Sequence, residues 1–281
     1  MSRNLRSAEE WAEALAAWAI PDEILARARE SPWQLPRELF ARRADLQIER
    51  REGSSIARAE EALGVAGSVL DVGAGAGAGS LPLRGMTELV VVDTQPEMLE
   101  ELLTRANKRG LSTTAVVGQW PEVAPRTPAA DVVVCHHVLY NVPDIVPFVQ
   151  ALDQHARRRV VIELTAAHPL SGLNPLWRHF HQLERPERPT WRDAVAALRA
   201  AGLDPREELS HRSVEPSTMT TFEDVVRMTR LRLCLDGSRE AEVIAELGKM
   251  GVRPEDSTSW SLGSPEIATL WWETARGGRS T

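Results

Sequence analysis

Cysteine, lysine and long apolar runs are all scarce in this chain of 281 residues. The only two cysteines, Cys135 and Cys234, lie far apart and lack a C-x-x-C spacing, which argues against a disulfide framework and a zinc site. No apolar run reaches the roughly 18 residues that a membrane span needs. The amino terminus carries acidic residues where a secretion signal would need an apolar stretch. We therefore expect a cytoplasmic protein with no membrane partner and no metal ligands.

Basic residues are outnumbered by acidic ones, and the formal net charge is −7. Such a balance argues against a chain whose main affinity comes from neutralising phosphates, although it leaves room for a local basic surface. Among the 33 basic residues, only Lys108 and Lys249 are lysines. We attribute the excess of arginine to codon usage rather than to nucleic-acid recognition.

Residues 68–80, SVLDVGAGAGAGS, contain a short apolar run that leads into a glycine-rich turn. The run is β-branched and bounded by glycines, which favours a central parallel strand. The glycines that follow can adopt positive φ angles, and they have no Cβ that would block a ligand. They are Gly73, Gly75, Gly77 and Gly79. A strand with such a turn, followed by a helix, predicts a ligand crevice at the carboxyl end of the strand.

The acidic residue Asp71 distinguishes between two kinds of ligand for this turn. Gly73, Gly75 and Ala78 formally satisfy the dinucleotide pattern G-x-G-x-x-G/A, but these glycines alone are a weak signal. A carboxylate two residues before the first glycine would repel a pyrophosphate, whereas it would attract a ligand with an ammonium group and a sulfonium. A dehydrogenase is therefore disfavoured.

Three segments carry a resemblance to one family. With Asp71 included, VLDVGAGAG resembles the first motif of the class I S-adenosylmethionine-dependent methyltransferases. A second apolar run, residues 89–92, ends at Asp93, at a distance from the glycines suited to a ribose hydroxyl partner. The text DTQPEML is similar to the second motif of the family, and ADVVVC followed by HHVLYNVPD is similar to the fourth. The resemblance covers roughly residues 65–165.

The resemblance implies S-adenosylmethionine as the cofactor and suggests which residues hold it. Where the family usually has an acidic partner for the adenine amino group, this chain has Gln119, whose carbonyl accepts a hydrogen bond more weakly. Trp120 either lies against the adenine or packs in the core. The backbone at Cys135 and the side chain of His136 are expected to face the methionine part. The predicted cofactor-binding residues are Asp71, Gly73, Ala74, Gly75, Asp93, Thr94, Met98, Gly118, Gln119, Trp120, Cys135 and His136.

Histidines near the strand ends are candidate bases. A hydroxyl or a protonated amine acceptor needs a base, worth about a hundred- to ten-thousandfold in rate. His136 and His137 are the predicted catalytic residues, and His137 is the likelier base only if its ring points away from the cofactor. Glu163 and His168 are further candidates, because they and Thr165 follow a strand whose end should share the rim of the glycine turn. For each of them a structural hydrogen-bonding role is the alternative.

The resemblance predicts an α/β, Rossmann-like methyltransferase fold with a mostly parallel seven-stranded sheet between helices. We expect a helical lid over residues 1–55, a cofactor-binding core over 56–170, and the remainder of the core with a helical insertion over 171–281. Within these segments, Trp33 and Phe40 are candidate lid residues, Thr94 is expected to cap a helix, and the sixth strand is expected around Val214. The last strand, 266–276, should be antiparallel.

These observations favour a methyltransferase acting on an oxygen or nitrogen atom of a small molecule. The alternative acceptor is an RNA, above all ribosomal RNA, or a protein. The motifs expected of enzymes that methylate DNA bases are missing, so a DNA acceptor is disfavoured while these two acceptors stay open. A third possibility is a non-catalytic cofactor-binding protein that regulates a partner. The sequence identifies neither the acceptor nor the oligomeric state, because substrate choice in this fold is made by the lid and the inserted helices.

Overall fold

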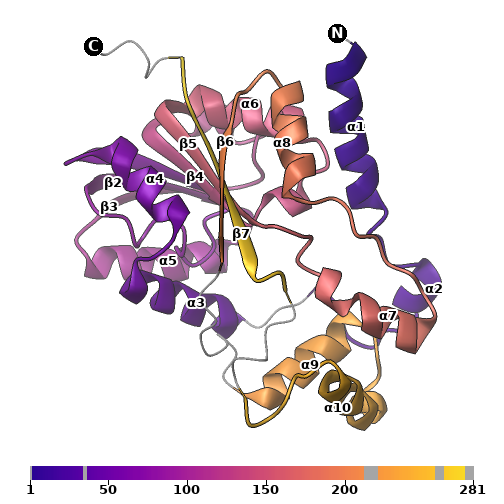
Figure 1. The fold of residues 1–281 in the computed structure, drawn as a ribbon. Helices are drawn as coiled ribbons and strands as arrows, with labels where there is room; N and C mark the ends of the chain where they lie inside the picture. Colours follow the sequence, from indigo (N-terminus) through magenta and orange to yellow (C-terminus); the bar gives the residue numbers. More distant parts are fainter. Residues whose placement is uncertain (1, 34–36, 212–220, 257–262, 276–281) are drawn as a thin grey trace.

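A sheet of seven strands runs through the protein in the order β3-β2-β1-β4-β5-β7-β6 (Figure 1). The computed structural model describes residues 2–33, 37–211, 221–256 and 263–275. Strands β1 to β5 are parallel, and β7 is antiparallel to both β5 and β6. The strands are β1 Gly67–Val72, β2 Met86–Asp93, β3 Ser112–Val117, β4 Ala130–His136, β5 Ala156–Thr165, β6 Arg206–His211 and β7 Glu266–Glu273. The predicted fold class, a mostly parallel seven-stranded sheet, is confirmed.

Helices cover both faces of the sheet. They are α1 Ser2–Ala16, α2 Asp22–Leu25, α3 Arg37–Arg50, α4 Ser54–Leu63, α5 Pro96–Lys108, α6 Ile145–His155, α7 Asn174–His181, α8 Trp191–Ala200, α9 Phe222–Arg232 and α10 Glu240–Lys249. Helices α4 and α5 pack on one face, and α6 packs with α8 on the other. In the described ranges, no helix combines the length and the apolar character needed to cross a membrane.

The two faces of the central strand belong to two separate parts of the core. Leu70 and Val72 lie in the cluster that includes side chains of α6 and α8, whereas Val69 lies in the cluster beneath α4 and α5. Because side chains alternate along a strand, Asp71 shares the face of Val69. The alternation of side chains along β1 therefore places the Asp71 carboxylate on the face of the sheet that α4 and α5 cover.

The first helix contributes to the core on the α6 and α8 face. Helix α1 lies along α8 (Figure 1), and its Trp11 is buried. The Trp11 indole Nε1 donates a hydrogen bond of 2.8 Å to the carbonyl of Val142 and the ring stacks on Tyr140. Residues 1–55 thus include a segment that packs as core, and the lid role of this region stays a prediction.

The chain passes from β1 to β2 through turns, and the helix predicted there is absent from residues 73–85. This segment contains five glycines and Pro82, and glycines 73, 75, 77 and 85 all have positive φ. Such residues disfavour a helix because glycine loses much backbone entropy and proline removes a donor. The prediction of a helix directly after the glycine turn was wrong.

Three boundaries differ from expectation in the rest of the chain. Gln95, not Thr94, is the N-cap of α5, and it makes no side-chain capping bond. The sixth strand is Arg206–His211, whereas Val214 lies outside the described residues. The last strand ends at Glu273 rather than at 276.

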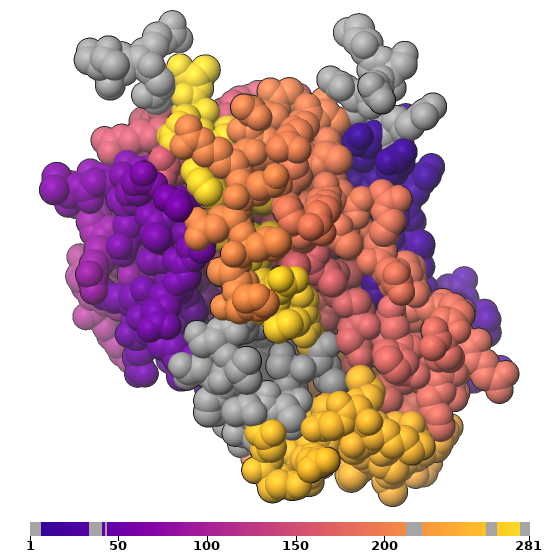
Figure 2. All heavy atoms as spheres, in the orientation of Figure 1, coloured from indigo at the N-terminus to yellow at the C-terminus, as the bar shows by residue number. Residues whose placement is uncertain are grey.

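A pair of inserted helices forms a satellite core of its own. Helices α9 and α10 lie between β6 and β7 and pack against α7 through buried apolar side chains such as Val226, Leu247 and Trp177. Figure 2 shows this insertion at one end of the molecule, beside the α7 segment. The helical insertion expected before the last strand is present.

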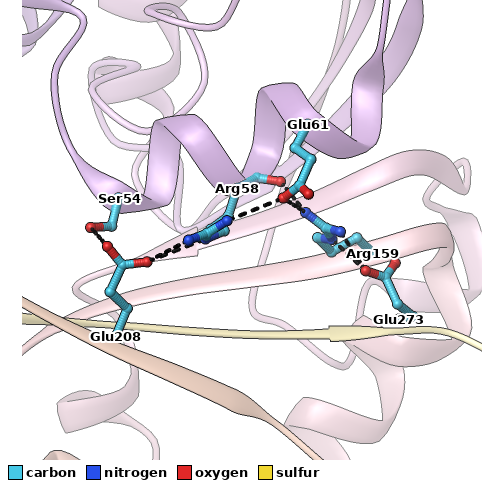
Figure 3. Close-up of polar contacts among 6 residues, drawn as sticks. All are labelled: Ser54, Arg58, Glu61, Arg159, Glu208 and Glu273. Atoms are coloured by element: carbon cyan, nitrogen blue, oxygen red, sulfur yellow. Dashed lines mark hydrogen bonds and ion pairs between the residues drawn. The ribbon is translucent and has the colours of Figure 1, made fainter.

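Helix α4 is fastened to the sheet by a set of charged side chains (Figure 3). The Arg159 side chain, 8% exposed on β5, donates hydrogen bonds to Glu61 of α4 at 2.9 Å and to Glu273 of β7. It also donates to the backbone carbonyl of Arg58 at 2.7 Å. A single guanidinium therefore joins α4 to two strands.

A second contact fixes the amino-terminal end of the same helix (Figure 3). Arg58 pairs with Glu208 of β6 at 2.9 Å, and the Ser54 hydroxyl donates to the same carboxylate at 2.8 Å. Arg58 also lies over the Trp271 ring, 4.7 Å from its centroid. Together the two sets hold both ends of α4 in one position on the sheet.

Replacing Arg159 with Met should lower the free energy of unfolding by about 2 to 3 kcal/mol, because the Arg58 carbonyl and two carboxylates lose a largely buried donor. Denaturant unfolding would measure the loss. The matched control is Arg178→Met, which breaks a pair with Glu184 whose side chains are 65% and 72% exposed. The control should leave the unfolding midpoint unchanged, and equal midpoints for the two variants would contradict the role given to Arg159.

Candidate functional site

A cavity of about 590 Å³ lies at the carboxyl ends of the parallel strands. Its volume is within the range of small-molecule sites, roughly 300 to 1,000 Å³. All predicted cofactor-binding residues except Cys135 line it. Cys135 is fully buried, and burial raises the pKa of its thiol well above the ordinary value. The lining residues are Gln47, Asp71 to Ala76, Ala78, Gly79, Val92 to Gln95, Met98, Gly118 to Trp120, His136 to Val138, Asn141, Val142, Phe148 and Glu163.

The glycine turn after β1 passes very close to the loop after β4. Gly73 has a φ of 74°, and a Cβ there would lie 2.3 Å from Cγ2 of Val138. Only glycine combines this conformation with this approach. The turn therefore forms one wall of the cavity while the β4 loop forms the next.

Asp93, at the end of β2, holds the turn in place. Its Oδ2 accepts a 2.8 Å hydrogen bond from the backbone N–H of Gly75, and its Oδ1 accepts one of 3.0 Å from Gln95. The carboxylate thus links the glycine turn to the start of α5. Because each carboxylate oxygen has two lone pairs, both retain accepting capacity for a ligand.

Asp71 is the most deeply buried carboxylate in the cavity wall, with 1% of the residue exposed. Burial raises its pKa, the Ser80 hydrogen bond lowers it, and the neighbouring Asp93 charge raises it, to a net value of about 7. Within the described part of the chain, its Oδ2 has no hydrogen-bond partner. A buried carboxyl group with an unpaired oxygen is suited to a positively charged ligand.

His136 lies against the glycine turn. A Cβ on Gly79 would be 3.1 Å from the His136 Nδ1 and 3.5 Å from the Asp71 Oδ1. The absence of a side chain at position 79 thus makes room for the imidazole beside the buried carboxylate. His136 occupies the side of the cavity formed by β1.

His137 is directed to a different partner, Glu163 of β5. Its φ of 60° is in the left-handed region, and its backbone N–H donates a 2.7 Å hydrogen bond to the Glu163 carbonyl. Its Nε2 lies 3.0 Å from Oε1 of the Glu163 carboxylate. The two histidines are neighbours in sequence, but the change in backbone direction at His137 separates their surroundings.

The Glu163 carboxylate has partners on both oxygens. The hydroxyl of Ser55, on α4, donates a short hydrogen bond to its Oε2. Burial by itself would raise the pKa of Glu163, but the His137 hydrogen bond, the charges of His136 and His137, and the Ser55 hydroxyl hold it well below its ordinary value. Glu163 is therefore ionised at neutral pH.

Gln119 and Trp120 follow β3, and both line the cavity. The Trp120 indole is 5% exposed, donates a hydrogen bond of 3.2 Å to the Phe148 carbonyl and meets His155 edge to face. Its contacts are those of a core side chain with one part at the cavity wall. Gln119 is the more open of the two.

Thr165 and His168 were expected on the same rim, and they are not among the described lining residues. The Thr165 hydroxyl donates to the Ala167 carbonyl at 2.7 Å, and the His168 ring stacks on Trp18 with 3.8 Å between centroids. Burial and the Arg185 charge lower the pKa of His168 to about 4. After β5 the chain turns away from the cavity, so the placement predicted for these two residues was wrong.

Several lining residues were not found by sequence reasoning. Gln47 comes from α3, ahead of the first strand, and Val138, Val142 and Phe148 come from the segment after β4. Ser55 is 108 positions from the carboxylate that it contacts. Nothing in the sequence around a serine in an amphipathic helix marks it for such a contact.

The comparisons with known proteins agree with this geometry. Residues 69–159 match a family model described as "Methyltransferase domain". No curated protein matches the chain in sequence. The matched segment spans β1 to β4 and the start of β5, which include the glycine turn, Asp93 and both histidines.

Solved structures share the fold at low sequence identity. A putative methyltransferase from Bacillus halodurans C-125 is 16% identical with a TM-score of 0.50, and the likeness covers 79% of this chain and 99% of that chain. The YcgJ protein from Bacillus subtilis is 17% identical with a TM-score of 0.48, covering 83% and 97%. Magnesium protoporphyrin IX methyltransferase from Synechocystis PCC 6803, solved with bound SAH, is 20% identical with a TM-score of 0.43, covering 59% and 74%.

The Bacillus halodurans structure shows the shared fold, and the matched family model covers the segment that builds most of the cavity wall. The Asp71 oxygen that has no hydrogen-bond partner among the described residues is suited to a ligand that carries positive charge. Residues 69–159 are therefore similar to a methyltransferase domain, and the fold of the chain is one that a putative methyltransferase shares.

Proposed function

We propose that this protein is an S-adenosylmethionine-dependent methyltransferase that acts on a hydroxyl or amine of a small molecule, and that this acceptor is neutral or positively charged. The charge of the cavity carries the proposal. Asp71, Asp93 and Glu163 line the cavity, and no lysine or arginine is among the described residues that line it. An RNA acceptor would bring phosphates, whose binding depends on basic side chains. An acidic cavity instead favours an acceptor without negative charge.

The proposed roles of the lining residues follow from their placement. Asp93 retains lone pairs for the ribose hydroxyls, Asp71 attracts the positively charged amino-acid part, and the Gln119 carbonyl accepts from the adenine amino group. When bound, the cofactor supplies a methyl group on a sulfonium: the acceptor's electron pair forms the new bond, and the pair of the broken carbon–sulfur bond stays on sulfur.

The chain itself contributes mainly by holding the reactants. Alignment of two reactants in a dry cavity accounts for roughly 7 to 11 kcal/mol of barrier lowering in favourable cases. The remaining requirement is removal of a proton from a hydroxyl or ammonium acceptor. His136 lies beside Asp71 and the glycine turn, which supports a cofactor-binding role, whereas His137 lies beside Glu163, which supports a role as base.

A panel of acceptors tests the proposed substrate class. The protein and S-adenosylmethionine would be incubated with phenols, catechols, amines, aromatic carboxylic acids and ribosomal RNA, and formation of S-adenosylhomocysteine would be followed. We expect turnover with at least one hydroxyl or amine compound, unaffected by salt between 50 and 200 mM, roughly the interval over which phosphate-based binding collapses. Methylation of the RNA alone, with a steep salt dependence, would refute a small-molecule acceptor.

Substitution of Asp93 should weaken cofactor binding. Asp93→Ala removes a charged acceptor, which is worth about 1.5 to 3 kcal/mol, so the dissociation constant should rise by about ten- to a hundredfold. Asp93→Asn retains an oxygen for the Gly75 N–H and should show a smaller loss. Calorimetry with S-adenosylhomocysteine measures both, with exposed Asp204→Ala as the control. Unaltered affinity in the alanine variant would remove Asp93 from the site.

Cofactor affinity should depend on pH through Asp71. Its pKa of about 7 lies above the ordinary value of 3.8, and only the ionised form attracts a cation. Binding of S-adenosylmethionine should therefore release a proton below pH 7 and be about tenfold weaker at pH 6 than at pH 8. Calorimetry in buffers of different ionisation enthalpy measures both quantities. Asp71→Asn should bind more weakly and lose this dependence; a wild-type affinity that is constant over the interval would contradict the role of Asp71.

A further inference from the structure

Ser55, Glu163 and His137 form a chain of polar contacts that runs from α4 to the cavity. Ser55 is buried, with 1% of the residue exposed, and its hydroxyl donates to Oε2 of Glu163. The other carboxylate oxygen lies 3.0 Å from Nε2 of His137. Glu163 and His137 both line the cavity, and their side chains are 17% and 22% exposed. The contact chain therefore ends at the space where an acceptor would lie.

The backbone at His137 reinforces this arrangement. Its N–H donates 2.7 Å to the carbonyl of Glu163, so main chain and side chain meet the same residue. A φ of 60° is uncommon for a residue other than glycine and carries some strain. The fold thus holds His137 by one backbone contact and one side-chain contact to the same residue.

We propose that Ser55 and Glu163 are positioning residues that orient His137 as the base of the methyl transfer. With Nε2 3.0 Å from the Glu163 carboxylate, the favoured neutral form would carry its proton on Nε2, and Nδ1 would be the basic nitrogen. Ser55 fixes the rotation of the carboxylate from the opposite side. The idea rests on the proposed function, since it names the group that receives the proton of a hydroxyl or ammonium acceptor.

The proton transfer balances within this set. The acceptor loses H⁺ to Nδ1, its bonding electron pair stays on its oxygen or nitrogen, and the ring becomes an imidazolium facing an ionised carboxylate. The charged groups around this imidazole are Glu163 from β5 and His136 from β4, while α4 contributes the neutral Ser55. An imidazole oriented by a carboxylate recurs in unrelated enzymes that need a base at neutral pH.

Two neighbouring serines of α4 provide a matched pair of variants. Ser55 donates to Glu163, whereas Ser54 donates to Glu208, a carboxylate on β6 outside the cavity lining (Figure 3). Ser55→Ala and Ser54→Ala each remove one hydrogen bond from a serine to a carboxylate. If the hydrogen bond of Ser55 had only a structural role, Ser55→Ala and Ser54→Ala would affect His137 to the same extent. The proposal predicts that only Ser55→Ala alters His137.

Nitrogen-15 NMR of the His137 ring, with S-adenosylhomocysteine bound, reads the tautomer directly and needs no acceptor. In the wild type at pH 8, the Nε2–H form should exceed the Nδ1–H form by about tenfold, as expected for a hydrogen bond to a charged acceptor. Glu163→Gln should reduce this ratio strongly, Ser55→Ala should reduce it less, and Ser54→Ala should leave it unchanged. A predominant Nδ1–H form in the wild type would overturn the proposal.

Turnover of the best acceptor from the panel provides a second measurement. His137→Asn, chosen because asparagine tolerates positive φ, should lower kcat by about a hundredfold or more without changing the KM for S-adenosylmethionine. Ser55→Ala should lower kcat more than Ser54→Ala does. Equal values for the two serine variants would refute the positioning role.

The inference and the proposed function fail separately. If the wild-type tautomer is as expected but no small molecule is methylated, the contact chain stands and the proposed acceptor class is wrong. If a small molecule is methylated while Glu163→Gln leaves both tautomer and kcat unchanged, the acceptor class stands and the positioning role is wrong.

Discussion

The cavity depends on how the end of β2 fixes the glycine turn: the Asp93 carboxylate accepts a hydrogen bond from the Gly75 N–H, and the Val92 carbonyl accepts from Gly73 and Ala74. A chain with five glycines in thirteen residues, 73–85, has many accessible conformations. The charged acceptor at the end of the next strand selects one of them, and the contact of Gly73 with Val138 sets its distance from β4. The backbone that lines the cavity is thereby fixed without a helix behind it.

The charge of the cavity follows from the same construction. Strand β1 alternates between the two parts of the core, so Asp71 is carried into the interior on the α4 and α5 face. Burial there disfavours its ionised form, and the raised pKa shows that the folded protein holds an unfavourable charge at this point. A cationic ligand beside Asp71 would relieve that cost, and it would thereby gain affinity.

The other side of the cavity depends on α4. Arg159 and Arg58 fasten this helix to β5, β6 and β7, and Ser55 lies in the same stretch of helix. Most of these ion pairs are partly exposed and contribute little stability one by one, but Arg159 is largely buried and has three partners. The network matters chiefly because it sets where the Ser55 hydroxyl meets Glu163.

The sequence alone determined the strands β1, β2, β4 and β5 and the glycine turn, because apolar runs and turn residues are local signals. The expectation that Gln119 and His136 lie at the same cavity as Asp71 and Asp93 came from the resemblance of three motifs to one family. The tertiary structure alone decided that β1 is followed by turns, that His168 leaves the rim, and that His136 and His137 have different neighbours. It also decided the contact of Ser55 with Glu163, across 108 positions. Such contacts arise from the packing of a helix on a sheet, and no local pattern of residues encodes the partner that packing supplies.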